Sequence, residues 1–590
     1  MADSDPNPGH EATVDGAPGD GVRDRAPGAG PGAPRLRAWV RLARRGDLLL
    51  GAAIGACAAF SLAQLLLYGF GRDQAIYAAV ADEMARGGAP YADAWDFKPP
   101  GIFFIYLLAR VFGSGEHAIR VVEVLAWLSL ILAFTRLSRR HLGGPLGGLM
   151  GGCLATIVVS QLEFWHTAQP ESFAAVALAW AVLLASTGAG AGPRPTGRQE
   201  LLAWAGAGAC FTLAGLLKFP HGGGILISWV LLCRRSIRAA RLEGDGLGRC
   251  ARAALRPTLA LTGGALAVLG PLLLYFARAG ALRALGETLF VFAPEYTKIG
   301  GWSFTAFLLG IYPALREVLA GFSPLLLVGV LLLGVTGRAR GGSEPLGHAL
   351  GAFAFAVIAV PLQGKGFAYH YVPALALCAL FAGVGYGELL ASLRGRPVRS
   401  LLVLLAFAVV YRAYPAMRTT PIPYFQRVRD RMRSLRLPGP ERRRLLARLS
   451  SAGDVDGVAN REAAAWVADY TAPGAHVYVW GFEPSIYVYA RRRPASRYIY
   501  NVPQRASWSR QRYRPRLLED LDRRPPAVIL VEKGDRYSWV TGDEQDSLGA
   551  LAGFTELRAR LERDYRKEKT SAKFVFYVRQ SPPPAGTAAP

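Results

Sequence analysis

The chain has 590 residues, of which 52% are hydrophobic and only 19% are charged, and its formal net charge at pH 7 is +25. A soluble protein of this length usually carries more charge and less continuous apolar sequence. The arginines gather in short links between apolar blocks, as the positive-inside bias produces, and no groove-reading motif accompanies them. The composition therefore excludes an ordinary soluble domain and argues against nucleic-acid binding.

Residues 1–40 are rich in Gly, Pro, Ala and Asp, contain no signal-peptide core, and are expected to form a disordered cytoplasmic tail. Apolar blocks of about 20 residues follow, a length that crosses a hydrocarbon core of roughly 30 Å as a helix. We expect a transmembrane domain over 47–417, with spans near 47–70, 118–136, 144–162, 171–188, 201–218, 221–234, 258–277, 322–336, 347–363, 371–391 and 399–415.

The basic links are expected on the cytoplasmic side, which makes residues 71–117 the first outer loop and 278–321 a later one. With about 11 spans, the C-terminus lies outside, whereas an even number would reverse it. The sequence thus predicts an α-helical multi-pass protein of a bacterial plasma membrane. Richness in Ala, Gly and Arg is compatible with a high-GC bacterium.

After the last span the sequence changes character. Residues 418–454 form a basic amphipathic connector, which either lies on anionic lipid headgroups or is a solvated helix. In 455–580, "REAAAWVADY" and "RLLEDLDRR" have helical spacing, whereas "AHVYVWG", "PAVILVEKG" and "AKFVFYV" are typical of buried strands. We expect a small α/β extracytoplasmic domain there, followed by a disordered tail over 581–590.

The first outer loop combines features that a solvated loop does not require. Asp73 is expected two or three residues beyond the first span, a helix "AIYAAVADEMARGG" follows, and "PYADAWDFKPPG" joins rigid prolines to one cation, Lys98. "GIFFIYLLARVFG" is short for a span and is interpreted as an interfacial helix. A base at the membrane surface beside a cation suits a substrate with a lipid anchor and a reactive head.

This loop resembles the first outer loop of polyprenyl-phosphate-sugar glycosyltransferases with the type C fold. It is similar to the bacterial family-39 and Rgt-like enzymes, relatives of protein O-mannosyltransferases and of lipid A aminoarabinose transferases. "HTAQPESF" over 166–173 resembles the family's second outer loop, and "GKGFAYHYVPALALCALFAG" over 364–383 resembles its later HY-containing loop. One departure is Gln74, where many relatives have a second acid.

The resemblance implies transfer of a sugar from a polyprenyl-phosphate donor to a glycan, lipid or protein acceptor of the cell envelope, on the outer face. Asp73 would accept the proton of the acceptor hydroxyl. Lys98 would hold the phosphate of the leaving group, which needs no acid catalyst because it is already a low-pKa anion. A single displacement would invert the anomeric centre.

Other candidates have structural alternatives. Glu171 is either catalytic or a helix N-terminal acid stabilised by the helix dipole, and His166 is either a substrate contact or an interfacial polar residue. Tyr91, Trp95 and Asp96 either line a sugar subsite or pin the loop. A second group could grip a phosphate or anchor its loop at the interface: Lys365, Tyr369 and His370. A weaker pair that could join the phosphate site is Lys218 and His221.

We expect no obligatory metal, although outer carboxylates could bind a divalent cation. The main alternative function is a transporter or flippase of lipid-linked sugars, which would place ionisable groups near the bilayer midplane, often in repeated halves. The spans are almost free of acids, with Glu123 and Glu388 as the main exceptions, and no repeat is evident. A receptor or scaffold is a third possibility, but it leaves the KPP-containing loop unexplained.

Overall fold

The structure is a computed structural model that describes residues 33–189, 197–244, 246–299, 301–336, 343–393, 396–413, 423–452 and 455–580. Of the tails predicted from the sequence, only residues 33–40 fall within these ranges, where they begin helix α1 (Ala33–Leu65). The chain divides into two units, residues 1–49 and 50–590. Everything described below belongs to the second unit.

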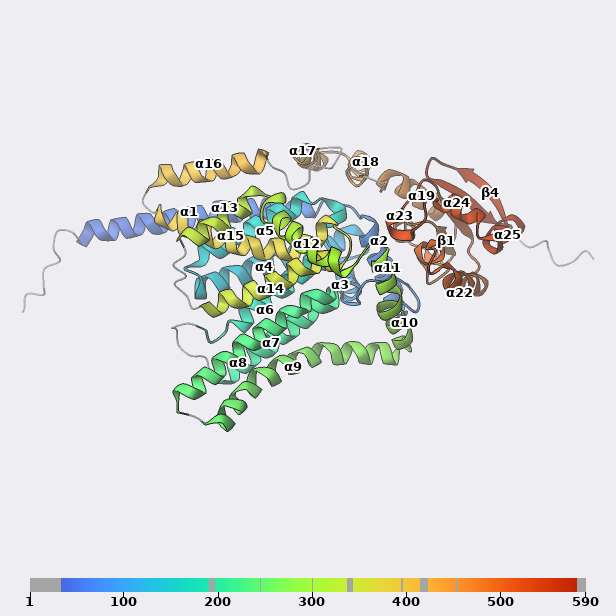
Figure 1. The fold of residues 1–590 in the computed structure, drawn as a ribbon. Coiled ribbons are helices and arrows are strands. Elements are labelled where there is room, and N and C mark those ends of the chain that lie inside the picture. Colours follow the sequence, from blue (N-terminus) through green and yellow to red (C-terminus); the bar gives the residue numbers. More distant parts are fainter. Residues whose placement is uncertain are drawn as a thin grey trace, which may run out of the picture. The chain divides into compact units, whose positions relative to one another are not determined.

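The second unit is built mainly of long apolar helices (Figure 1). Within the described residues, seven segments are long and apolar enough to cross a membrane, and five shorter apolar helices accompany them. This confirms the predicted multi-pass helical class. The helices that correspond to predicted spans after the first are α4 (Glu116–His141), α5 (Pro145–Gln161), α6 (Pro170–Ala185), α7 (Gly197–Leu217), α8 (Gly224–Leu242), α9 (Leu247–Arg278), α13 (Pro324–Thr336), α14 (Ser343–Leu362), α15 (Val372–Ser392) and α16 (Pro397–Ala413).

Small residues allow α15 to pack closely at the centre of this bundle. α15 contacts α5 and α13 along its length, and most of its residues are buried. A Cβ atom added at Gly383 would lie within van der Waals overlap of the backbone of Gly151. Such close approach of small residues is a common basis of helix packing in membranes, where hydrophobicity alone does not drive association.

The predicted outer loop 278–321 is helical for most of its length. It contains α10 (Leu282–Glu287), a π-helical turn at Thr288–Phe292, α11 (Ala293–Lys298), α12 (Phe304–Arg316) and a second π-helical turn at Glu317–Gly321. The sequence-based span began only at 322 because Arg316 and Glu317 interrupt the apolar run. α12 lies against Pro361 near the end of α14, whereas α13 lies against Ala382 inside α15. Phe304–Gly321 is itself one of the seven segments long and apolar enough to cross a membrane, although the sequence placed it in a loop.

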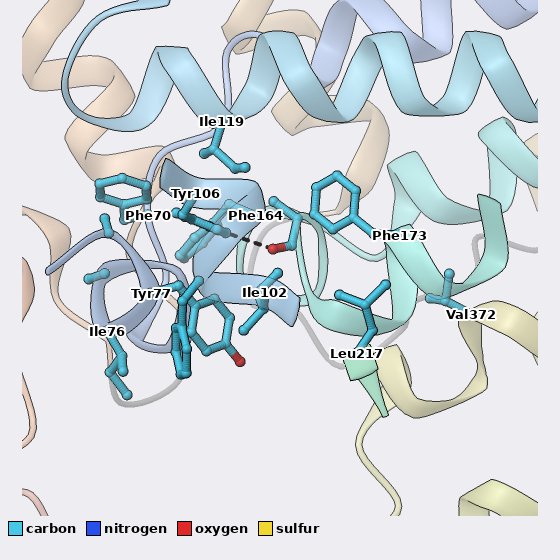
Figure 2. Packing of buried hydrophobic residues seen from close by; sticks show 14 of the residues in the cluster. Phe70, Ile76, Tyr77, Ile102, Tyr106, Ile119, Phe164, Phe173, Leu217 and Val372 are labelled. Atoms are coloured by element: carbon cyan, nitrogen blue, oxygen red, sulfur yellow. Dashed lines mark hydrogen bonds between the residues drawn. The ribbon is translucent and has the colours of Figure 1, made fainter. Parts of the chain in front are cut away.

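The first loop forms two short helices, α2 (Arg72–Met84) and α3 (Gly101–Ala109). α1 ends at Leu65, five residues earlier than expected, so Asp73 lies in the first turn of α2 rather than just beyond a span. Figure 2 shows that aromatic side chains join the two helices to the second loop. The rings of Tyr77 and Tyr106 are 5.4 Å apart, and the Tyr106 hydroxyl donates to the carbonyl oxygen of Ala168 at 3.0 Å.

The C-terminal region contains a five-stranded mixed sheet of order β2-β1-β3-β5-β4, as an α/β domain requires. The three predicted strands are β1 (His476–Trp480), β3 (Val528–Glu532) and β5 (Phe574–Arg579), and the two predicted helices are α19 (Gly457–Tyr470) and α22 (Arg510–Arg523). β1 is parallel to β2 (Arg493–Pro494) and β3, whereas β5 is antiparallel to β3 and β4 (Tyr565–Thr570). The shorter helices are α20 (Ser485–Ala490), α21 (Val502–Arg505), α23 (Ser538–Thr541), α24 (Ser547–Ala552) and α25 (Thr555–Asp564).

The basic connector forms α17 (Tyr424–Ser434) and α18 (Gly439–Leu449). One face of α17 meets neither lipid headgroups nor solvent, because Arg427 and Arg431 are buried, whereas Arg429 on the other face is 74% exposed. Both buried guanidinium groups pair with the carboxylate of Glu163, and the Nε of Arg427 lies 2.9 Å from it. This cluster fastens the connector to the second loop, and a charge that finds a buried partner need not face water or lipid.

Candidate active site

A cavity of about 400 Å³ opens where α2, three loops and the C-terminal domain meet. Such a volume is typical of a small-molecule site. Its lining comes from residues far apart in sequence, and it is mostly aromatic with a few polar groups. The lining residues are Arg72, Asp73, Ile76, Phe97, Lys98, Trp165, His166, Tyr296, Phe367, Tyr369, Ala452, Val455, Phe482, Tyr537, Trp539 and Val540.

Asp73 and Lys98 lie together in this cavity. The Nζ of Lys98 is 4.0 Å from Oδ2 of Asp73. Burial opposes the charge of Lys98, but the carboxylates of Asp73 and Asp96 outweigh it and hold the pKa of Lys98 above its ordinary value. Lys98 therefore keeps its positive charge at ordinary pH and lies beside the half-buried carboxylate of Asp73. The pair offers an anion contact and a proton acceptor in one place.

The loop that carries Lys98 is fixed by three residues that were expected in a sugar subsite. The Tyr91 hydroxyl donates to the carbonyl oxygen of Lys98 at 2.8 Å, and Asp96 accepts from the hydroxyl of Tyr500 at 2.7 Å. Trp95 packs inside the protein and its indole N–H donates to Thr288 at 3.2 Å. None of the three lines the cavity, so the alternative that they pin the loop fits the structure.

Gln74 holds the second loop in place. Its side-chain N–H group faces the carbonyl oxygens of Phe164, Trp165 and Thr167, at 3.0, 3.2 and 2.5 Å. A carboxylate has no proton to donate to these oxygens. The amide that departs from the family pattern is therefore a structural donor, and it positions the segment that brings Trp165 and His166 to the cavity.

His166 and Tyr369 line the cavity next to Asp73. Burial lowers the pKa of His166 to about 3 against the opposing effect of Asp73, so the imidazole is neutral at ordinary pH. Its Nε2 accepts from the indole of Trp165 at 2.5 Å, and its ring lies 5.6 Å from that of Tyr369. His166 therefore contributes shape and polarity to the cavity rather than charge.

Lys365 and His370 belong to the wall behind Tyr369 rather than to the lining. The Lys365 ammonium donates to the carbonyl oxygen of Trp539 at 2.8 Å and lies 3.8 Å from the ring centre of Tyr296. Burial and the nearby charge of Lys98 lower the pKa of Lys365 to about 8. His370 is buried, with Nδ1 2.6 Å from the carbonyl oxygen of Lys365.

Glu171 is fully buried at the start of α6 and does not line the cavity. Lys218, at the end of α7, has its Nζ 3.4 Å from Oε1 of Glu171. His221, also buried, follows Lys218 in the next turn. The pair of Glu171 and Lys218 thus lies outside the cavity lining, but near enough that the charge of Glu171 also helps to raise the pKa of Lys98.

The sequence analysis missed several lining residues, among them Phe482, Tyr537 and Trp539 of the C-terminal domain. Arg72, the residue before Asp73, was also missed. Its guanidinium donates to the carbonyl oxygen of Phe482 at 2.7 Å, to Glu483 at 3.0 Å and to the Tyr537 hydroxyl at 2.5 Å. Phe97 and Trp165 are next to the predicted residues Lys98 and His166, so the sequence did point to their positions. Nothing local marks Tyr537 or Trp539.

Among the residues that the structure describes, no group of three or more His, Cys, Asp or Glu side chains is arranged to hold a metal ion. Of the described residues that line the cavity, the charged ones are Arg72, Asp73 and Lys98.

Comparison with known proteins identifies the architecture. Residues 97–241 match the family model described as dolichyl-phosphate-mannose-protein mannosyltransferase. The solved structure of ArnT from Cupriavidus metallidurans bound to undecaprenyl phosphate is 16% identical, with a TM-score of 0.54 over 90% of this chain and 98% of ArnT. Its apo state is 17% identical, with a TM-score of 0.53 over 91% and 98% of the two chains. No curated protein matches the chain in sequence. The match of residues 97–241 to this family model agrees with the resemblance expected from the sequence, and the likeness to ArnT shows that the chain has the same fold.

Proposed function

We propose that the protein moves a sugar from a polyprenyl-phosphate donor to a cell-envelope acceptor by inverting single displacement, with Asp73 as the base. The observation that supports this is the contact of Asp73 with Lys98 in one cavity, at 4.0 Å. We further propose that the cavity faces the outer side of a bacterial plasma membrane, with the domain after α18 on that side. The distribution of arginines supports this orientation.

In this reaction the acceptor hydroxyl oxygen bonds to the anomeric carbon as the bond from that carbon to the phosphate oxygen breaks. The hydroxyl proton passes to the carboxylate of Asp73, and the electron pair of the broken bond leaves with the polyprenyl phosphate. Lys98 stabilises the growing negative charge on that phosphate. Because Lys98 is buried, its interaction with an anion is stronger than it would be in water.

The experiment compares wild type with Asp73→Asn in nanodiscs, using a panel of polyprenyl-phosphate sugars and measuring release of polyprenyl phosphate. Asp82→Asn is the matched control, because Asp82 lies on the same helix and pairs with Arg110, and its side chain is as exposed as that of Asp73, at 22% and 23%. General-base removal typically costs about 10²–10⁴-fold in rate. A donor consumed equally by wild type and Asp73→Asn rules out Asp73 as the base.

Lys98 is tested by binding rather than by rate. Loss of a charged hydrogen bond of about 1.5–3 kcal/mol weakens affinity roughly 10- to 150-fold. Lys98→Gln is therefore expected to weaken binding of polyprenyl phosphate by that factor, whereas Lys298→Gln, an exposed lysine paired with Glu295, is expected to leave it unchanged. Equal binding by wild type and Lys98→Gln would contradict the phosphate contact.

A further inference from the structure

One wall of the cavity is contributed by the C-terminal domain and is almost entirely aromatic. Phe482 follows β1, and Tyr537, Trp539 and Val540 lie at and around α23. The rings of Phe482 and Tyr537 are 5.5 Å apart, and those of Tyr537 and Trp539 are 5.7 Å apart, both edge to face. The three rings thus form a continuous surface, which we name the aromatic wall.

Trp539 is the exposed member of the aromatic wall. Its side chain is 51% exposed, whereas Tyr537 is buried. Its backbone is nevertheless tied down, because its carbonyl oxygen accepts the hydrogen bond from Lys365 at 2.8 Å. An exposed indole on a fixed backbone is a preformed contact surface that loses little conformational freedom when a ligand binds.

Among the lining residues that the structure describes, the charged groups near the wall are either already bound or belong to the reacting pair. The guanidinium of Arg72 lies over the rings of Phe482 and Tyr537, at 4.9 and 4.5 Å from their centres, and is bound to Glu483. His166 is neutral because burial lowers its pKa to about 3. Asp73 and Lys98 remain for the reaction itself. Of these lining cations, Lys98 is the one left for an anionic group, and it belongs to the reacting pair, whereas Lys365 is bound to the backbone of Trp539 from outside the lining.

The chemistry of the wall selects among possible ligands. Aromatic rings with polar edges suit a molecule with apolar faces and hydroxyl groups, as a sugar ring has. An extended peptide would be expected to pair with a strand edge, but the described residues at this wall belong to a loop and a short helix. A fatty chain would desolvate the charged groups of Arg72, Asp73 and Lys98, which line the same cavity.

We propose that the aromatic wall is the acceptor subsite and that it receives a neutral carbohydrate, with Trp539 stacking on the sugar ring. This inference rests on the proposed function, since it takes the pair of Asp73 and Lys98 as the reacting centre. It also gives the C-terminal domain a direct part in choosing the acceptor.

The test uses the full chain in nanodiscs on an array of neutral oligosaccharides, anionic oligosaccharides and peptides. Wild type is expected to be retained by neutral oligosaccharides. Trp539→Ala should weaken that retention about 10-fold, which corresponds to about 1.4 kcal/mol and lies within the range for stacked ring pairs, and Trp539→Phe should keep it within about 3-fold. Trp302→Ala, an exposed tryptophan outside the cavity lining, serves as the control.

Retention by peptides or anionic glycans alone, retention by nothing, or equal retention of wild type and Trp539→Ala overturns the proposal. Binding of polyprenyl phosphate is measured on the same samples and should be equal in wild type and Trp539→Ala, which also shows that the variant is folded. Binding of polyprenyl phosphate by Lys98→Gln tests the proposed function and does not test the aromatic wall. The two hypotheses therefore fail by different readouts.

Discussion

Removing the negative charge of Glu163 is expected to loosen the connector between the membrane helices and the C-terminal domain. Glu163 is almost completely buried between Arg427 and Arg431, whose side chains are 0% and 1% exposed. At 2.9 Å and an effective dielectric constant of about 20, each contact supplies an attraction of about 6 kcal/mol. Breaking a buried pair by removing one partner costs about 3–5 kcal/mol after solvation is counted. Glu163→Gln should lose this amount locally.

The assay is hydrogen–deuterium exchange of the α17 amides in the full chain, because a membrane protein of this size need not unfold in one step. A loss of about 3 kcal/mol speeds exchange roughly 150-fold. Glu519→Gln, which breaks an exposed pair with Arg523 at 3.5 Å, should change exchange little, since such pairs contribute about 0.3–0.5 kcal/mol. Exchange of α17 within about 3-fold of wild type in Glu163→Gln would refute the reasoning.

Three further predictions concern the cavity and the loops around it. Gln74→Glu should lower the stability of the second loop by about 1–3 kcal/mol, because a carboxylate cannot donate to the three carbonyl oxygens; thermal denaturation checks this, and a variant as stable as wild type contradicts it. The pH profile of donor consumption should show no step near 6.5 from His166, whose pKa is about 3. The positive charge of Lys365 is present below about pH 8, so any attraction it adds to the phosphate should be lost as the pH rises through that value, and Lys365→Met should abolish this step. A step that persists in Lys365→Met would assign it to another group.

The sequence was sufficient to predict the class of fold and to predict that Asp73 and Lys98 lie near each other. Both residues belong to one loop, where the first turn of a helix and a proline-bounded turn limit the possible arrangements. The edge strand β4 was not predicted, because "YRKEKT" lacks an apolar alternation and is exposed after its first residue. Charged residues on an edge strand prevent pairing with other chains, and they also hide the strand from pattern analysis.

The roles of individual aromatic residues were harder to predict. Trp95 lies in a loop and Trp539 in the four-residue helix α23, both next to polar residues, yet Trp95 is buried against Phe292 and Trp539 is exposed in the cavity. The difference depends on which distant segment covers each ring. The local sequence does not show which distant segment packs on a given ring. A buried tryptophan and one that forms a binding surface therefore look alike before the fold is known.

The position of the proposed base depends on a part of the chain far from it. Arg72 precedes Asp73 in the first turn of α2, and its guanidinium is held by Phe482, Glu483 and Tyr537. The orientation of that turn is therefore set by residues more than 400 positions away. Because a rigid support near the reacting groups matters more than their mere presence, the C-terminal domain contributes to the geometry of the reacting pair as well as to the wall of the cavity. The domain predicted over 47–417 accordingly contains the proposed reacting pair, whereas the residues that hold Arg72 lie in the C-terminal region.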